Sequence, residues 1–145
     1  MKAVVLPVPA HWRQIEPPLS KYAVADDLVL EVSAIQTLPE DPPAWMRVEV
    51  ARRTGITIEG STTVTTTTGW PMLLANAVYG EQKLLVAMFQ FLELAAIATL
   101  DGAAAAFDKQ VDDVKLVLMQ ATVHWGEPPV TLAALLTGAT PAKHP

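Results

Sequence analysis

The N-terminal part of the chain consists of short apolar runs separated by turn-forming residues. Residues 4–8 form a β-prone run that ends in a turn at Pro9. Residues 22–24 and 28–35 have the composition of strands, and Asp26-Asp27 between them suits a hairpin turn. The pattern therefore predicts an N-terminal strand followed by a β-hairpin.

A helix is predicted over residues 43–53. Asp41 is a suitable N-cap, Pro42 and Pro43 suit a first helical turn, and Thr54-Gly55 suits a helix end. The apolar residues of this segment do not form one clean stripe, so the helix is predicted from its ends rather than from its amphipathicity.

From Ile56 onward the apolar period changes to two. Even-numbered residues up to Thr66 are mostly apolar or carry a methyl group and odd-numbered ones are polar, as in a strand with one exposed face. The run STTVTTTTGWP (residues 61–71) continues this pattern, and the branched Cβ of threonine favours the extended backbone. We expect its even positions to face the core and its odd positions to present hydroxyls to water or to a partner.

Three further strands are predicted after the turn at residues 69–71. They cover residues 72–79, 84–91 and 94–100, and the second is apolar on both faces, which indicates a central, covered strand. Glu93 separates the last two only weakly, so one bent strand is an alternative. Consecutive strands joined by such short turns are expected to run antiparallel.

The second helix is predicted over residues 103–121, with Asp101 as its N-cap. Beyond Lys115 this helix is apolar all round, so residues 130–136 or a second subunit should cover its far side. Residues 1–137 are predicted to form a single domain, and residues 138–145 a disordered tail. The helix has an apolar stripe at Phe107, Val111, Val114, Leu118 and Ala121, with Asp108, Lys109, Asp112 and Asp113 turned away from it.

Composition narrows the class of protein. The chain has 145 residues, no cysteine, 51% hydrophobic residues and a formal net charge of −5. The absence of cysteine removes disulfides and thiolate sites, and the scattered basic residues argue against nucleic acid as a partner. No segment has the length or the apolarity of a signal peptide or a membrane span. We therefore expect a cytoplasmic protein without membrane insertion.

No catalytic, cofactor or metal site is predicted. The histidines do not stand at ligand spacing, and His124 with Glu127 is the nearest approach to a pair. The threonine run has no histidine base nearby in sequence, and the glycines form no phosphate-binding loop. The aspartates of the second helix lie opposite its apolar stripe, which favours a solvated face.

Three tryptophans are more open to interpretation. Trp12, Trp70 and Trp125 each adjoin a turn signal, and tryptophan is enriched at protein interfaces. Each could equally cover one end of the core. As candidate partner-binding residues we take these three tryptophans together with Leu116 and Met119 of the all-round apolar helix end.

The order of elements resembles a group of α/β/α sandwich proteins. The segment VVLPVPAHW (residues 4–12), the helix after DPPAW, the GWP turn and the LLVAMFQF strand carry the resemblance. The group includes the photosystem protein PsbP, the yeast Ran-binding Mog protein, the DcrB lipoproteins and the Eag-type chaperones of type VI secretion effectors. The resemblance implies a binding, adaptor or chaperone role rather than an enzyme. It transfers no individual functional residue.

Together these observations predict an α+β fold, a single-domain α/β/α sandwich with a mostly antiparallel sheet of about six strands and two main helices. The predicted protein is non-enzymatic, has no cofactor and forms a dimer. Its predicted function is that of a chaperone or adaptor, which binds another protein, such as a secreted effector, in an apolar groove. One alternative is a small-ligand protein or enzyme with a pocket between the sheet and the C-terminal helix, anchored by Tyr79, His124 or the threonines. Another is an immunity or regulatory protein that binds through Asp108, Asp112 and Asp113.

Overall fold

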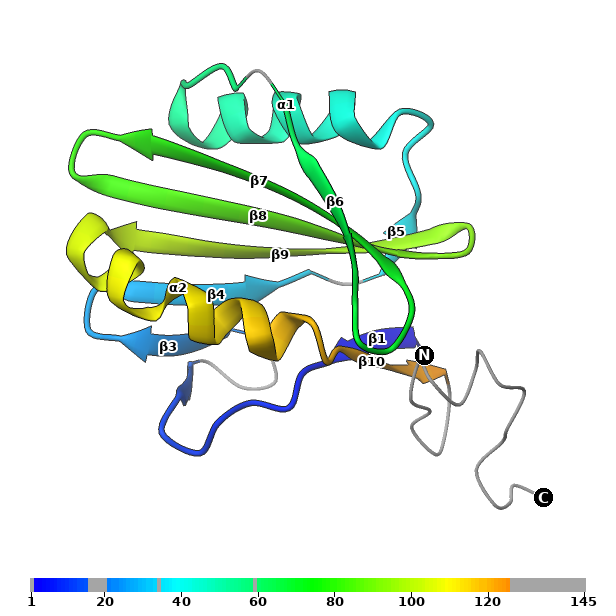
Figure 1. Ribbon diagram of the computed structural model, residues 1–145, viewed down its shortest axis with the longest axis horizontal. Coiled ribbons are helices and arrows are strands. Elements are labelled where there is room, and N and C mark those ends of the chain that lie inside the picture. The colour runs from blue at the N-terminus through cyan, green and yellow to red at the C-terminus, as the bar shows by residue number, and fades with distance from the viewer. Residues whose placement is uncertain (1, 16–20, 34, 59, 126–145) are drawn as a thin grey trace.

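The computed structural model describes residues 2–15, 21–33, 35–58 and 60–125. These residues form an α+β fold with two helices and a mostly antiparallel sheet, as predicted (Figure 1). The predicted domain end at residues 130–137 and the tail at residues 138–145 lie outside the described residues. The strands are β1 (Lys2–Val5), β2 (Arg13–Ile15), β3 (Lys21–Ala25), β4 (Leu28–Val32), β5 (Gln36–Thr37), β6 (Thr62–Thr65), β7 (Pro71–Tyr79), β8 (Gln82–Phe91), β9 (Leu94–Ala103) and β10 (Thr122–Trp125), and the helices are α1 (Pro42–Thr54) and α2 (Ala104–Leu118).

The main sheet has eight strands rather than about six. Its order is β2-β3-β4-β9-β8-β7-β6, and β5 also pairs with β9. Strands β2 and β5 have three and two residues, too few to show a period of two, so the sequence pattern could not reveal them. The strand predicted from Ile56 begins only at Thr62.

A separate two-stranded sheet joins the two ends of the described chain. Strand β1 pairs antiparallel with β10, with Val5 opposite Thr122. The apolar run at residues 4–8 thus forms a strand only at its beginning. Strand β10 lies just after the predicted end of the second helix and was not predicted.

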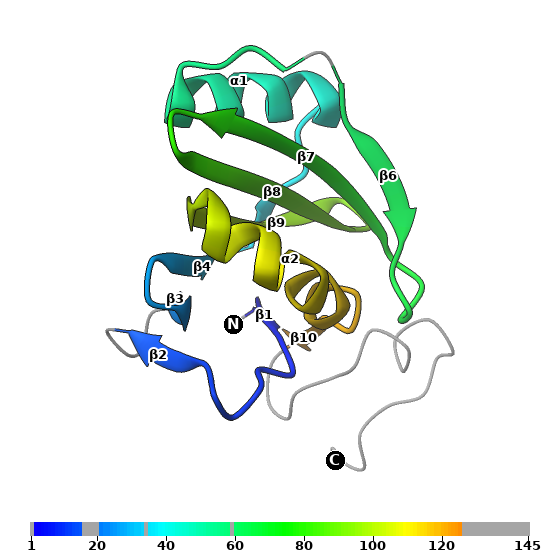
Figure 2. The ribbon, with the colours of Figure 1, turned by 60° about the vertical axis from the view of Figure 1, so that its left-hand side comes forward.

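Strand β8 is covered on both faces, as its continuous apolar run predicted. Its residues Leu85, Ala87, Phe89 and Phe91 belong to the buried cluster that includes residues of α2. The alternate residues Leu84, Val86 and Met88 belong to the cluster that includes residues of α1. Because neighbouring side chains of a strand point to opposite faces, α1 and α2 pack against opposite faces of the main sheet (Figures 1 and 2).

Helix α1 has the ends that the sequence predicted. The Asp41 side chain accepts a hydrogen bond from the Ala44 main-chain nitrogen over 3.2 Å, and Pro42 follows it in the first turn. Gly55 ends the helix in the left-handed conformation, with a φ of 76°. Capping residues therefore define this helix, although its apolar stripe is narrow.

Helix α2 begins differently from the prediction. Asp101 and Gly102 continue β9, and Ala103 precedes the helix without a side-chain cap. The predicted Asp101 cap is wrong because this carboxylate instead accepts a hydrogen bond from the Tyr79 hydroxyl. The predicted stripe is correct: Phe107, Val114 and Leu118 are buried, and the aspartates opposite them are exposed.

The alternative of one bent strand over residues 84–100 is also wrong. A two-residue turn at Leu92 and Glu93 separates β8 from β9, and these strands pair along their whole length from Gln82 opposite Ala103 to Phe91 opposite Leu94. Leu92 takes a positive φ of 61°, a conformation suited to such a tight turn.

Candidate functional site

Helix α1 covers only part of its face of the main sheet. It packs on β7 and β8, and its buried cluster extends to Ala95 and Ile97 of β9, so the part of this face that it leaves open is formed by β3, β4 and the end of β9 from Thr99 onward. Figure 1 shows α1 along the β7 side of the sheet, away from β3 and β4. The open sheet surface beside α1 is therefore formed by the β3–β4 hairpin and by the last residues of β9.

A groove with a volume of about 830 Å³ lies on this surface. That volume is in the range of protein clefts that hold ligands. A smaller hollow of about 80 Å³, lined by Ser33 and Ile97 among others, adjoins it and shares Glu31, Arg53 and Thr99 with it. The residues that line the groove are Ile15, Lys21, Asp26, Asp27, Val29, Glu31, Arg53, Gln82, Thr99, Asp101, Gly102 and Ala103.

The floor of the groove is set by strand register. Lys21, Glu31 and Thr99 form one row across β3, β4 and β9, because Lys21 pairs with Glu31 and Glu31 pairs with Thr99. Val29 and Asp101 are directly opposite each other in the next row on the same face. Residues far apart in the sequence are thus held side by side by a rigid sheet.

Thr99 is the buried polar residue of this floor. It is 5% exposed, and its hydroxyl has no hydrogen bond to another described residue. It lines both the groove and the smaller hollow. Its hydroxyl is not among the fully buried unpaired polar atoms, so it is accessible from the groove and offers a hydrogen-bonding group at the bottom of it.

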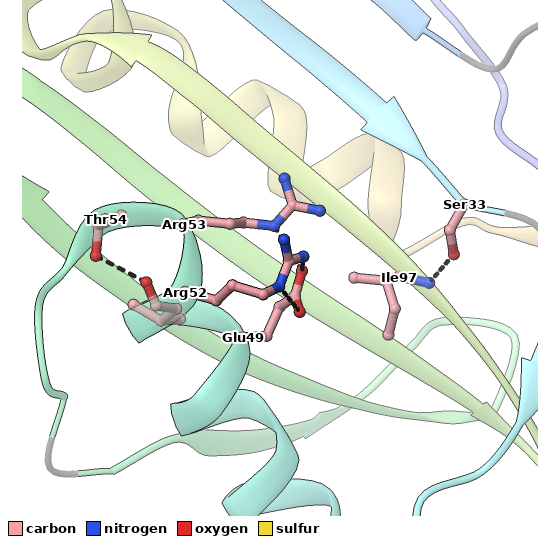
Figure 3. Close-up of polar contacts among 7 residues, drawn as sticks. Ser33, Glu49, Arg52, Arg53, Thr54 and Ile97 are labelled. Carbon is pink, nitrogen blue, oxygen red and sulfur yellow. Dashed lines mark hydrogen bonds and ion pairs between the residues drawn. The ribbon is translucent and has the colours of Figure 1, made fainter.

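The wall of the groove is formed by an ion cluster on α1. The Glu49 carboxylate accepts a hydrogen bond from Arg53 Nε over 2.7 Å and another from Arg52 (Figure 3). Burial by itself raises the pKa of Glu49, but the hydrogen bonds and charges of the two arginines outweigh it and lower that pKa below the ordinary value. Glu49 is therefore anionic and holds Arg53, which lines the groove, in place (Figure 3).

Tyr79 and Asp101 meet near one end of the groove. The Tyr79 hydroxyl donates a hydrogen bond to Asp101 Oδ1. Burial, with this hydrogen bond and the charge of Asp101, raises the pKa of Tyr79 to about 12. The tyrosine therefore stays protonated at neutral pH and fixes the orientation of one groove carboxylate.

The groove is acidic. Four carboxylates and two cations line it, which gives a formal charge of −2. The ion pairs found among the described residues join Glu49 to Arg52 and Arg53, and Lys83 to Asp108. None of the four groove carboxylates, which belong to Asp26, Asp27, Glu31 and Asp101, is therefore in an ion pair within the described part of the chain.

The candidate residues predicted from the sequence lie elsewhere. Trp12 and Trp70 are each 6% exposed and belong to the cluster on the α2 face, where Trp70 packs edge-on against Phe91. This is the packing of tryptophans that cover the core, the alternative that the sequence left open for them. Trp125 lies in β10 opposite Lys2, and its side chain is outside the described residues.

The two candidates of the apolar helix end differ from each other. Leu116 is 62% exposed, whereas Met119 is partly buried against the α2-face cluster. The loop before β7 brings Met119 close to Trp70, because Thr67 donates to the Met119 carbonyl and the Trp70 main-chain nitrogen donates to Thr66 Oγ1. What covers Leu116 is not found among the described residues, and the predicted cover at residues 130–136 lies outside them.

The threonine run fits the predicted alternation only in part. Val64 is partly buried and Thr66 is buried, while Thr63 and Thr65 are exposed, as expected. Thr62 is exposed at a position expected to face the core. Beyond the strand, Thr67 and Thr68 donate hydrogen bonds to the carbonyls of Met119 and Ala121, so these hydroxyls help to satisfy the end of α2.

The groove itself was missed by sequence reasoning. Its signal is the appearance of Glu31, Thr99 and Asp101 in segments that are otherwise apolar. On their own strands these residues look like ordinary solvent-facing positions. Only the pairing of β4 with β9, which joins segments far apart in sequence, places them together beside α1.

Within the described ranges, no group of three His, Asp or Glu side chains is placed to hold a metal ion. No described helix is both long enough and apolar enough to cross a membrane. No protein-family model and no curated protein matches this chain.

Proposed function

We propose that this chain is a non-enzymatic protein-binding module, an adaptor or chaperone that holds a segment of another protein in the groove beside α1. The observation that carries the proposal is the groove of about 830 Å³ on an uncovered part of a rigid sheet. Its floor belongs to paired strands and its wall to a capped helix, so the surface is preformed. Its lining contains no histidine and no hydroxyl paired with a base, which argues against catalysis there.

The proposed surface differs in character from the apolar groove expected from the sequence. Charged residues line much of it, with Val29 and Ile15 as the apolar part. A polar, charged groove suits reversible association with a peptide segment more than permanent burial of an apolar helix. The proposed role is still that of an adaptor or chaperone, but the binding surface is a charged groove rather than an apolar one.

The α/β/α sandwich of the resemblance is part of the same proposal. The packing of α1 and α2 against opposite sheet faces supports it. Membership of the PsbP, Mog, DcrB and Eag group would agree with a binding role, and a secreted effector as the partner belongs to that reading. Fold likeness alone does not define a function, so the groove remains the main support.

Self-association is the second part of the proposal. Leu116, 62% exposed near the end of α2, supports a contact between two copies. Light scattering of the wild-type protein and of a Leu116→Ser variant tests this. A wild-type dimer that becomes a monomer in the variant is expected, and a wild-type monomer at all concentrations would remove the homodimer from the proposal.

Site-specific photo-crosslinking tests the binding role. Val29 on the groove floor is replaced by a photoreactive phenylalanine derivative, and Asn76, exposed on β7 and facing the other side of the sheet, serves as the control. In cells that express the protein, we expect a discrete crosslinked polypeptide from position 29 and none from position 76. Equal products from both positions, or none from either, would overturn the proposal.

The small-ligand alternative moves to the same groove. The space between the sheet and α2 is filled by a buried cluster that includes Phe89, Leu100 and Leu118, so a pocket there is not supported. The groove volume and the Thr99 hydroxyl would suit a small polar molecule. Native mass spectrometry of protein purified from its own cells distinguishes the readings, because a small bound mass would favour the ligand and a bound polypeptide the adaptor.

The acidic-surface alternative rests on α2. Asp108, Asp112 and Asp113 are exposed, as that alternative requires, but Asp108 is engaged in an ion pair with Lys83. They lie on the exposed face of α2, whereas the groove has both shape and charge. A crosslink from Asp112 but not from Val29 would favour this alternative.

A further inference from the structure

We infer that the groove recognises a basic peptide segment and seats one lysine or arginine side chain of that segment between Glu31 and Thr99. This inference rests on the proposed binding function and specifies the chemistry of the partner. It follows from three features of the groove: its charge, its unpaired buried hydroxyl and the placement of its own two cations.

Charge defines the sign of the ligand. The groove has a formal charge of −2, and its four carboxylates are free of ion pairs among the described residues. An acidic peptide or a phosphate group would have to approach all four. A cationic side chain is attracted to them, and the attraction is stronger in a partly buried cleft than at a flat surface.

Geometry defines where the cation sits. Glu31 and Thr99 are directly opposite each other in the antiparallel pair of β4 and β9. The Cβ atoms of such a pair lie about 4.5–5.5 Å apart, so a carboxylate and a hydroxyl point into the groove side by side. An ammonium group has three donors and a guanidinium group has five, enough to reach both acceptors at once.

The Thr99 hydroxyl supplies a second, independent indication of a ligand. It is nearly completely buried, faces the groove and has no partner in the described part of the chain. Its oxygen is accessible from the groove, so a donor from a bound side chain can reach it. Acidic residues alone are typical of a solvated surface. Thr99 adds a hydrogen-bond acceptor beneath them that no described residue uses.

The two cations of the groove set the register of the peptide. Lys21 lies on the other side of Glu31 in the same row, and Arg53 projects from α1 with Glu49 bound to its Nε. Both flank the seat, so they oppose any cation beyond the one that Glu31 and Thr99 hold, and both can donate to main-chain carbonyls of an extended peptide. We therefore expect basic residues that are spaced along the segment rather than contiguous.

Peptide binding to the full chain tests the inference. Three short fluorescent Gly-Ser peptides are compared at low ionic strength by anisotropy, with lysine, glutamine or glutamate at alternate positions. The lysine peptide is expected to bind about tenfold more tightly than the glutamine peptide, and the glutamate peptide most weakly. Equal binding of the lysine and glutamine peptides, or tighter binding of the glutamate peptide, would overturn the inference.

Matched variants locate the site. Glu31→Gln and Thr99→Val are each expected to weaken the lysine peptide about fivefold or more, while Thr99→Ser, which keeps the hydroxyl, binds like wild type. Asp112→Asn makes the same charge change as Glu31→Gln on the exposed face of α2 and is expected to leave binding within about twofold. Equal losses in Asp112→Asn and Glu31→Gln would mean attraction by net charge alone and would overturn the site.

The two proposals can fail separately. A polypeptide crosslinked at position 29 together with no preference for the lysine peptide would overturn the basic-segment inference and leave the binding function in place. Lysine-peptide binding that depends on Glu31 and Thr99 supports the inference directly. Glu31 is exposed and valine has nearly the shape of threonine, so both variants are expected to fold, which their circular dichroism and unfolding curves verify.

Discussion

The Thr67 hydroxyl donates a hydrogen bond over 2.8 Å to the main-chain carbonyl of Met119, 52 residues further along the chain. The Thr67 main-chain nitrogen donates to the same carbonyl over 2.9 Å. This carbonyl lies directly after α2, where the last helical carbonyls lack partners within the helix. The loop between β6 and β7 therefore closes the C-terminal end of α2.

Thr67→Ala is expected to lower the free energy of unfolding by about 1 kcal/mol, because a side-chain hydrogen bond to a helix-end carbonyl is lost. Urea denaturation measures the change. Thr67→Ser, which keeps a hydroxyl, should recover most of it. Thr63→Ala removes an exposed threonine of β6 whose hydroxyl has no hydrogen bond among the described residues, and it serves as the matched control for strand propensity. Equal effects of Thr67→Ala and Thr63→Ala would contradict the closure of α2 by this loop.

Gly102 allows β9 to approach the β3–β4 turn. A Cβ added at this position would lie 1.9 Å from the main-chain oxygen of Asp27, a contact that only a backbone shift could relieve. That same oxygen accepts a hydrogen bond from the Ala103 nitrogen over 2.9 Å. Glycine is thus required for close packing inside a strand.

Gly102→Ala is therefore expected to cost about 3 kcal/mol or more of folding stability, since overpacking against backbone cannot be relieved by a side-chain rotation. Thermal and urea unfolding measure it. At Gly60 an added Cβ meets nothing within 4 Å, so Gly60→Ala should change stability by less than about 1 kcal/mol and can be slightly stabilising. Similar values for the two variants would show that the close approach at Gly102 is absent in solution.

The sequence predicted elements well where a local rule governs them. Helix α1 was placed by its cap Asp41 and its terminal Gly55, and the central position of β8 by an unbroken apolar run. These signals act within a few residues, so they can be recognised without knowing the fold. The Asp101 cap failed because a carboxylate at a strand end also suits a cross-strand partner, and Tyr79 was that partner.

The candidate site was not predictable in the same way. Glu31 and Thr99 become neighbours only through the pairing of β4 with β9, and the groove exists only because α1 is displaced toward β7. Both facts depend on strand order, which periodicity does not encode. For a related reason the sequence left open whether Trp12 and Trp70 face a partner or cover the core, because an adjacent turn signal does not show which way a side chain points, and both are buried.

Tyr79 should make stability depend on alkaline pH. Burial and the Asp101 carboxylate raise its pKa from 10.0 to about 12 in the folded protein. A raised pKa contributes stability that is complete below pH 10, and that is lost as pH rises toward 12, because the unfolded chain loses its proton first. The free energy of unfolding of the wild type should therefore fall over this interval.

Urea denaturation of the wild type and of Tyr79→Phe between about pH 8 and pH 11 checks this expectation, because that range brackets the ordinary pKa of tyrosine. The phenylalanine variant should be less stable by about 1 kcal/mol near neutral pH, and the difference should narrow above the ordinary pKa of tyrosine. Asp101→Asn removes the charge and keeps an acceptor oxygen, so the pKa of Tyr79 should be raised less and the loss of stability, which begins at the same pH, should be smaller. Parallel curves for wild type and Tyr79→Phe would contradict the raised pKa.

Glu49 should give the opposite dependence in acid. Its pKa is lowered from 4.5 because the hydrogen bonds and charges of Arg52 and Arg53 outweigh the effect of burial. A lowered pKa contributes stability that is present above the ordinary value and is lost as pH falls through the folded-state pKa, where the native carboxylate must take up a proton. Glu49→Gln is expected to be about 1 kcal/mol less stable than wild type at neutral pH, a modest value because both arginines remain partly exposed. The two unfolding curves should converge in acid, whereas Glu40→Gln, at an exposed carboxylate before α1, should follow wild type throughout.

Glu49 also holds Arg53 at the groove. Glu49→Gln should therefore show a smaller preference for the lysine peptide over the glutamine peptide. An unchanged preference would show that Arg53 keeps its place without this ion pair.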